Sequence, residues 1–361
     1  MGANPRLRLR SRRNRLQLLA LTLALSLGGD AAGVPPERQA VSLEVLGKLE
    51  PSALTWSGNL GAWLLPTRHG IYTLRPGQLN ADLMVSAAQL GFPPQEIQSC
   101  GLSPASLLVY RFGRDSYAEY SRPDFRLLRE RGAAAVGVSA IGGLEWLGDS
   151  WVVIGRSYPA SGRKAQIQRL APGTLAFRSG VELRPDEQWV LRGLLEYGFI
   201  AVSRERDRAL LGFQGLRRVM VLSKNGAETE LVAPIPPGRA LEDNFGGRSP
   251  GNPEEYAGIY RGRRIIVGGG WQNDINFLVT ADPGGGTAVI RVYSSVAGRP
   301  FALRSTLPVA SSDPRDAFLA SVSSAPGGPP EMLLLIARYT GGSKADSRQV
   351  VRLPLPDAPQ K

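Results

Sequence analysis

One short segment holds charged residues whose types and spacing suit ligand chemistry. Arg204, Arg206 and Arg208 alternate with Glu205 and Asp207 directly after an apolar stretch. Arginine side chains hold phosphate or carboxylate groups through paired donors, so this segment predicts an anion-binding site. The same alternation is also typical of a solvated, salt-bridged surface, and that alternative stays open.

A second segment joins a glycine run, 268–270, to four residues that suit ligand contacts. Glycine runs expose backbone N–H groups to anions, although after a strand such a run more often marks a turn. Asn273 and Asp274 supply polar donors and acceptors, and Trp271 offers either a platform for a ligand or a lid. The residues predicted to contact the ligand are Arg204, Arg206, Trp271, Gln272 and Asn273.

The counts of the usual catalytic residues exclude several classes of site. The chain has one histidine, His69, and one cysteine, Cys100. These numbers exclude an intrachain disulfide, a His-rich metal site and a Cys/His zinc site of ordinary ligand count. The sequence contains no Gly-x-Ser-x-Gly elbow to present a nucleophile. Cys100 is therefore expected to be a small buried apolar residue.

A repeated phrase indicates which elements position the candidate residues. In four places an aromatic residue is followed within two residues by glycine and then by an apolar strand, beginning at Trp56, Trp146, Tyr197 and Tyr260. Trp56 and Trp146 lie about 90 residues apart, twice a repeat of about 45 residues, which is typical of a propeller blade. We expect these aromatic residues to pack between blades.

Strand clusters between Gly/Pro-rich turns divide the chain into six units of three or four antiparallel strands. The units cover residues 49–94, 95–138 and 141–183, and contain the strands within 217–233, 276–293 and 332–353. The sequence therefore predicts an all-β fold, a six-bladed β-propeller formed by residues 34–361 as a single domain. Seven blades and a pair of β-sandwiches are the alternatives.

Shorter patterns predict three details of this architecture. Residues 41–45 alternate like a strand, and we expect them to join the last blade beside residues 350–355 and so close the ring. Residues 81–90 and 125–132 are expected to form short helices. The polar stretch 241–252 is expected to be an insertion loop.

The openings of several units resemble those of a known family. In segments 50–56, 142–146 and 256–260, small and aliphatic residues precede an aromatic residue and a glycine-turned strand. They resemble the repeated blade openings of the exported phytase-like esterase propellers. Segments 199–206 and 264–279 resemble blade strands of the same family, so the resemblance covers the chain roughly from residue 50 to residue 280.

This resemblance implies a funnel that binds calcium through clustered carboxylates and hydrolyses phosphoesters. Under that reading Glu205 and Asp274 act as catalytic acids or metal ligands, and Arg204 and Arg206 hold the anion. Hydrolysis would require five acids to converge on one funnel mouth: Glu50, Glu145, Glu205, Glu255 and Asp274.

The chain departs from the family where further acids are expected. Gly142 and Ala257 stand in place of Glu, and the run 268–270 stands in place of an Asp-rich loop. No metal site is therefore predicted, and the cofactor is left open, with calcium as the candidate. The favoured function is a propeller without strong catalysis that holds an anionic small molecule, or an envelope or protein partner, at its funnel. The alternative is a phytase-like phosphoester or ester hydrolase.

The first 33 residues have the three parts of an export signal. An arginine-rich segment precedes the uncharged stretch 16–27, and small residues at 29–33 offer a cleavage site. The uncharged stretch is shorter than the roughly 20 residues of a stable membrane span, so no transmembrane anchor is expected after cleavage. Sec and twin-arginine export both remain open. The protein is expected in a periplasmic, lumenal or extracellular compartment, and much of its net charge of +12 lies in the leader, so no nucleic-acid partner is expected.

Overall fold

The computed structural model describes residues 40–158, 166–187, 197–244, 253–283, 286–296, 299–311, 313, 316–338, 345 and 347–356. Residues Gln39–Lys361 form one compact unit. The predicted signal peptide, 1–33, lies outside the described residues. None of the helices in the described part of the chain combines the length and the apolarity needed to cross a bilayer.

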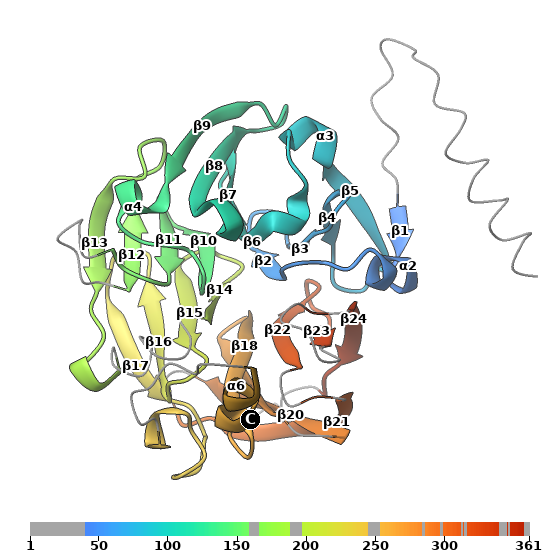
Figure 1. Ribbon diagram of the computed structural model, residues 1–361, viewed down its shortest axis with the longest axis vertical. Helices are drawn as coiled ribbons and strands as arrows, with labels where there is room; N and C mark the ends of the chain where they lie inside the picture. The colour runs from blue at the N-terminus through green and yellow to red at the C-terminus, as the bar shows by residue number, and fades with distance from the viewer. Residues whose placement is uncertain are drawn as a thin grey trace, which may run out of the picture. The chain divides into compact units, whose positions relative to one another are not determined.

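Four blade-like antiparallel sheets follow one another along the chain (Figure 1). The first has the order β1 (Ala40–Ser42), β5 (Asn80–Ser86), β4 (Gly70–Leu74), β3 (Ala62–Pro66) and β2 (Thr55–Ser57). The second runs β6 (Ile97–Leu102), β7 (Ser106–Arg111), β8 (Ser116–Ser121) and β9 (Leu127–Gly132). The third runs β10 (Gly143–Leu147), β11 (Ser150–Ile154), β12 (Ile167–Leu170) and β13 (Phe177–Val181). The fourth runs β14 (Gly198–Val202), β15 (Arg208–Phe213), β16 (Arg218–Ser223) and β17 (Glu228–Val232).

The fifth sheet has seven strands and a parallel pair at its centre. Its order is β21 (Ala302–Ser311), β20 (Gly286–Val296), β19 (Ile275–Asp282), β18 (Ile265–Gln272), β22 (Ala317–Ser324), β23 (Pro330–Arg338) and β24 (Ser347–Pro354). Strands β18 and β22 run parallel, and every other pair is antiparallel. The protein is therefore an all-β β-propeller, as the sequence predicts, built from four blade-like sheets and one curled sheet.

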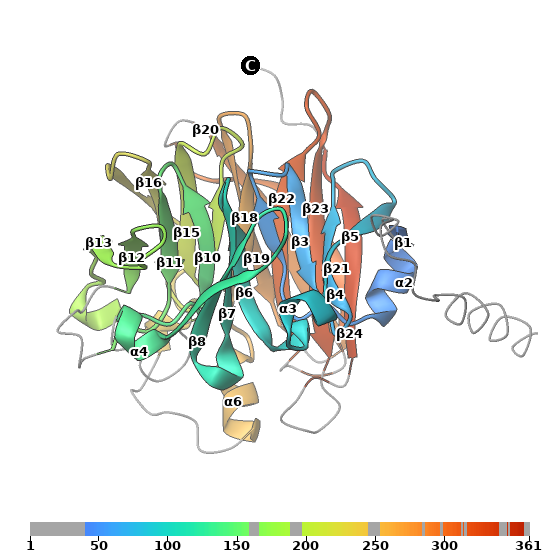
Figure 2. The ribbon, with the colours of Figure 1, turned by 90° about the horizontal axis from the view of Figure 1, so that it is seen from above.

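Short helices lie in the connections between strands. They are α2 (Leu43–Lys48), α3 (Ala87–Leu90), α4 (Ala133–Val136) and α6 (Pro253–Tyr260), with 3₁₀ turns η2 (Pro94–Glu96), η3 (Phe112–Arg114) and η5 (Glu242–Asn244). Figure 2 shows α3, α4 and α6 along one end of the sheets, which we call the connection face. The opposite end carries the turns that leave the inner strands.

Hydrophobic clusters fill the seams between neighbouring sheets. One cluster contains Trp63 and Leu65 of β3 together with Leu333 and Leu335 of β23, so the first sheet packs against the last strands of the chain. Comparable clusters join the first sheet to the second, the second to the third, the third to the fourth and the fourth to the fifth. Burial of these apolar faces is the main source of stability expected for such a fold.

Two of the four aromatic phrases occupy equivalent positions. Trp56 faces Trp63 across β2 and β3, and Trp146 faces Trp151 across β10 and β11. Each pair meets edge to face, with ring centroids 5.4 Å and 5.0 Å apart. The phrases at Tyr197 and Tyr260 instead precede β14 and β18, so the repeat mixes two different blade positions.

The predicted strand clasp at residues 41–45 is wrong. Ala40–Ser42 forms β1, but it pairs antiparallel with β5 at the outer edge of the first sheet and not with β24. The chain then turns into helix α2, whose Leu46 is buried in one cluster with Val350 of β24. Closure thus relies on side-chain packing at this seam, because the N-terminal strand pairs with its own sheet.

The helices expected at 81–90 and 125–132 are largely strands. Residues Asn80–Ser86 form β5 and Leu127–Gly132 form β9, and only the four-residue helices α3 and α4 follow them. Strand β9 faces solvent on most of its length, so it lacks the apolar alternation that identifies a strand in sequence. Conversely, segment 256–260, which resembles a blade opening, lies in helix α6.

The glycine run 268–270 is neither a loop nor a turn. It lies within β18, where Gly268, Gly269 and Gly270 pair in parallel with residues 320–322 of β22. A Cβ atom at Gly268 would lie 1.8 Å from the Ala320 carbonyl oxygen, and one at Gly270 equally close to that of Val322. The run is therefore required by the close approach of two inner strands.

Candidate functional site

The turns that follow the inner strands form a continuous surface, which we call the turn face. It comprises residues 58–61, 103–105, 148–149, 203–207, 273–274 and 325–329, together with the adjoining β16–β17 turn 224–227, whose Lys224 N–H donates to the Asp207 carbonyl oxygen at 2.7 Å. Asn59 of the first turn donates a hydrogen bond to the Leu102 carbonyl oxygen at the end of β6 and accepts one from Arg206 of the fourth turn. The Gly148 N–H of the third turn donates to the Arg206 carbonyl oxygen at 3.1 Å.

The first and fourth turns approach each other closely on this face. A Cβ atom at Gly58 would lie 3.1 Å from the Ser203 carbonyl oxygen and 3.2 Å from Arg206 Cγ. The Arg206 backbone is left-handed (φ 58°), and its N–H donates to the Ser203 carbonyl oxygen at 2.9 Å, within the fourth turn. The half-buried Arg206 side chain therefore ties these turns together, in addition to its predicted role in ligand binding.

The structure brings the two predicted segments together at the fourth and fifth turns. Arg208 Nη2 donates to Asp274 Oδ1 at 2.7 Å, and its guanidinium lies over the Trp271 ring at 5.0 Å from the ring centroid. Trp271 is buried and donates from Nε1 to the Ala201 carbonyl oxygen at 2.7 Å. Trp271 thus packs beneath the turn face, and its ring contacts the Arg208 guanidinium. This cation–π contact contributes roughly 0.5–2 kcal/mol of stability.

The remaining predicted residues divide into turn formers and exposed side chains. Gln272 Nε2 donates to the Gly328 carbonyl oxygen of the last turn at 3.0 Å. Asn273 has a left-handed backbone (φ 52°), which asparagine tolerates better than most residues. Arg204 and Glu205 are exposed at the tip of the fourth turn.

Arg208 joins the two predicted segments, although it is not among the residues predicted to contact the ligand. Its pKa is raised, chiefly by the hydrogen bond to Asp274 and also by Asp207, so it stays charged. Burial opposes ionisation of Asp207, but the Ser203 hydroxyl at 2.7 Å and the Arg208 charge lower the pKa of this carboxyl below its ordinary value. Sequence alternation reveals the charges of Arg208 and Asp207, whereas the bridge to Asp274 depends on the packing of two sheets.

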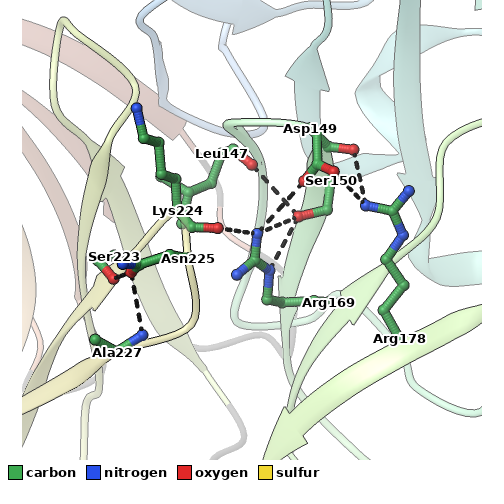
Figure 3. Close-up of polar contacts among 9 residues, drawn as sticks. All are labelled: Leu147, Asp149, Ser150, Arg169, Arg178, Ser223, Lys224, Asn225 and Ala227. Carbon is green, nitrogen blue, oxygen red and sulfur yellow. Dashed lines mark hydrogen bonds and ion pairs between the residues drawn. The ribbon is translucent and has the colours of Figure 1, made fainter.

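A second basic cluster lies beside the third turn (Figure 3). Arg169 is almost fully buried and donates to Ser150 Oγ from Nε at 3.0 Å and to the Lys224 carbonyl oxygen from Nη2 at 2.6 Å. Arg178 Nη1 donates to Asp149 Oδ2 at 2.8 Å, which lowers the pKa of Asp149. The exposed Lys224 side chain extends away from this network in Figure 3.

The five acids whose convergence would favour hydrolysis do not meet. Glu205 and Asp274 follow inner strands and lie on the turn face, whereas Glu50 precedes β2 and Glu255 lies in α6 at the connection face. Glu145 is buried within β10. Within the described part of the chain, no group of three His, Cys, Asp or Glu side chains is placed to hold a metal ion.

Glu145 is a buried carboxyl group with one unpartnered oxygen. The residue is 1% exposed, Oε2 accepts a hydrogen bond from the Trp146 N–H at 2.9 Å, and Oε1 has no hydrogen-bond partner. Burial raises the pKa of Glu145 well above its ordinary value, only partly opposed by that hydrogen bond. Glu145 therefore tends to retain its proton in the folded protein.

The single cysteine and the single histidine have no catalytic arrangement. Cys100 is a fully buried free thiol whose pKa is raised, first by burial and then by Glu145, which confirms its predicted place in the core. His69 lies in the turn between β3 and β4 on the connection face, where Nε2 accepts a hydrogen bond from Arg68 at 3.0 Å. Neither residue is therefore placed to act as a nucleophile or a general base on the turn face.

Comparisons with known proteins support the fold and go no further. No protein-family model matches the chain, and no curated protein matches it. A DUF4221 family member from Bacteroides vulgatus is structurally similar at 9% identity, covering 90% of this chain and 97% of that one with a TM-score of 0.50. Virginiamycin B lyase from Staphylococcus aureus (11% identity, 88% of each chain, TM-score 0.42) and the Cps50 (Swd1) β-propeller domain of Myceliophteria thermophila (11%, 86% and 87%, TM-score 0.43) also align.

Proposed function

We propose that the protein is a binding propeller that holds an anionic small molecule, or an acidic surface of an envelope or protein partner, on the turn face. One observation carries the proposal: Asp207 and Asp274 are both held by Arg208, whereas Arg204 and Lys224 remain exposed. Arg208 offsets one of these two negative charges, and the exposed basic groups beside them attract anions through the local excess of positive charge. Basic side chains outnumber acidic ones in this region, which contains Arg169, Arg178, Arg204, Arg206, Arg208 and Lys224 against Asp149, Glu205, Asp207 and Asp274.

The proposal includes three expectations from the sequence. The seven-stranded sheet represents two blades, one formed by β18–β21 and one by β22–β24, which are joined through the β18–β22 pair. With the four blade-like sheets this makes six blades. Residues 1–33 direct export, so the partner is met in a periplasmic, lumenal or extracellular compartment. The resemblance to phytase-like esterases marks a shared architecture and not shared catalysis.

Removing exposed positive charge from the turn face is expected to weaken anion binding. The probe is a sulfated polysaccharide such as heparin, titrated into the mature chain at several salt concentrations. The double variant Arg204→Ala/Lys224→Ala should bind about tenfold more weakly, because two exposed ion-pair contacts of roughly 0.7 kcal/mol each sum to about 1.4 kcal/mol. The variant should also show a shallower dependence of affinity on salt.

The matched control removes two arginines outside the turn face. Arg68 lies on the connection face and Arg131 on the outer strand β9, and both are exposed. Arg68→Ala/Arg131→Ala changes the net charge equally and should leave affinity within twofold of the wild type. Equal weakening by both double variants would mean that only net charge matters, and the turn face would lose its assigned role.

Hydrolysis of a phosphoester or other ester, the alternative function, is supported by the family resemblance alone. It predicts calcium-dependent release of phosphate that Asp274→Asn removes. The same protein preparation tests it, and turnover across an ester panel would favour the hydrolase.

A further inference from the structure

Three arginines surround one aspartate at the connection face. Asp282, the last residue of β19, accepts hydrogen bonds from Arg264 Nε at 2.7 Å, Arg264 Nη2 at 3.1 Å and Arg291 Nη1 at 2.6 Å. Arg239 Nη2 lies 3.7 Å from Asp282 Oδ2. We call these four residues the Asp282 cluster.

The cluster lies at the end of the seam between the fourth and fifth sheets. Ile266, Leu278 and Tyr293, which share strand faces with Arg264, Asp282 and Arg291, belong to the apolar cluster that fills this seam. Side chains alternate along a strand, so the charged residues continue the same inward face.

The connection between the two sheets covers the cluster. The Arg264 N–H donates to the Arg239 carbonyl oxygen at 2.8 Å, which fixes Arg239 beside it. The side chains of Arg264, Asp282 and Arg291 are 10%, 13% and 21% exposed, whereas that of Arg239 is 46% exposed. Arg239 is therefore the side of the cluster that faces solvent.

The charges in the cluster do not balance. Burial opposes ionisation of Asp282, but Arg264 and Arg291 lower its pKa, so it carries one negative charge against three positive ones. The neighbouring group of Arg217, Glu242 and Asp243 carries a net charge of −1, but both of its acids bond to Arg217 and not to the arginines of the Asp282 cluster. Partly buried positive charge without a counterion is costly, so the site favours an anion of charge −2.

We propose that the Asp282 cluster binds a small oxyanion of charge −2, such as phosphate or a phosphate monoester. Guanidinium groups present their donors as planar forks that match tetrahedral oxyanions better than a spherical anion. Arg264 uses its fork on Asp282, whereas Arg239 makes no hydrogen bond to that carboxylate among the described contacts and Arg291 uses only Nη1. Arg239 and Arg291 supply the remaining donors. The site lies at the opposite end from the turn face and does not depend on its proposed role.

Thermal unfolding of the full chain in inorganic phosphate tests the proposal. Phosphate should raise the melting temperature more than sodium chloride at equal ionic strength, and sulfate should act like phosphate. Arg239→Ala should weaken the apparent phosphate affinity about tenfold, and Arg239→Lys should weaken it less because the charge is kept without the fork. Arg131→Ala, on the outer strand β9, should leave the phosphate-dependent shift unchanged.

Two results would overturn the proposal. Equal shifts in phosphate and chloride would show general screening and no site. An unchanged phosphate-dependent shift in Arg239→Ala would give the cluster a purely structural role. The readout is the difference between melting temperatures with and without phosphate, so a change in the basal stability of Arg239→Ala does not obscure it.

Discussion

Replacement of Gly270 by alanine is expected to cost more than about 3 kcal/mol of unfolding free energy, a large fraction of the stability of a typical domain. The added Cβ atom would lie 1.8 Å from the Val322 carbonyl oxygen, far inside contact distance. That oxygen belongs to the backbone of β22, so no side-chain rotation relieves the clash. The parallel pair β18–β22 would have to separate. Denaturant unfolding of the purified variant measures the loss.

Gly113 provides the matched control for this substitution. It lies in the 3₁₀ turn η3, and a Cβ atom there would meet no atom within 4 Å. Gly113→Ala should therefore stay within about 0.5 kcal/mol of the wild type or become slightly more stable, since alanine loses less backbone entropy on folding. A Gly270→Ala protein as stable as Gly113→Ala would contradict the close pairing of the two inner strands.

Glu145→Gln is expected to make the protein more stable at high pH relative to the wild type. The folded-state pKa of Glu145 is raised above the ordinary value of 4.5. Between these two values the folded protein holds a proton that the unfolded chain has released. Wild-type stability therefore falls as pH rises through that window, by up to about 1.4 kcal/mol for each pH unit. Glutamine does not ionise, so the variant lacks this loss.

Unfolding free energies at pH 5 and pH 8 measure the effect. The advantage of Glu145→Gln should be larger at pH 8 than at pH 5. The control is Glu119→Gln, because Glu119 is equally buried but accepts from Ser106 Oγ at 2.8 Å and pairs with Arg129 at 3.0 Å. Loss of that ion pair should destabilise the protein by about 1–3 kcal/mol. Parallel pH profiles for Glu145→Gln and the wild type would refute a raised pKa at this position.

The sheets could be predicted from sequence because inner and middle strands are apolar and end at turns. Strand β11, for example, consists of five buried residues between Gly148 and Gly155. Outer strands such as β9, with most of its residues exposed, have no comparable signal. The clasp at 41–45 was mispredicted because alternation identifies a strand and not its neighbour.

The candidate site could be predicted only in part, for a related reason. Charge alternation located Arg204 to Arg208, and proximity in sequence located Trp271 to Asp274. No local pattern shows that Arg208 reaches Asp274, or that the glycine run faces a strand some 50 residues later. The Asp282 cluster was missed because its arginines come from three separate segments.

Hydrogen–deuterium exchange of the mature chain, with and without a saturating sulfated polysaccharide, tests the central claim most directly. Binding on the turn face predicts slower exchange at residues 148–150, 203–208 and 223–227. Exchange at the connection-face turns 67–69 and 112–115 should remain unchanged. Protection confined to the connection face, at a concentration where binding is saturated, would contradict the account.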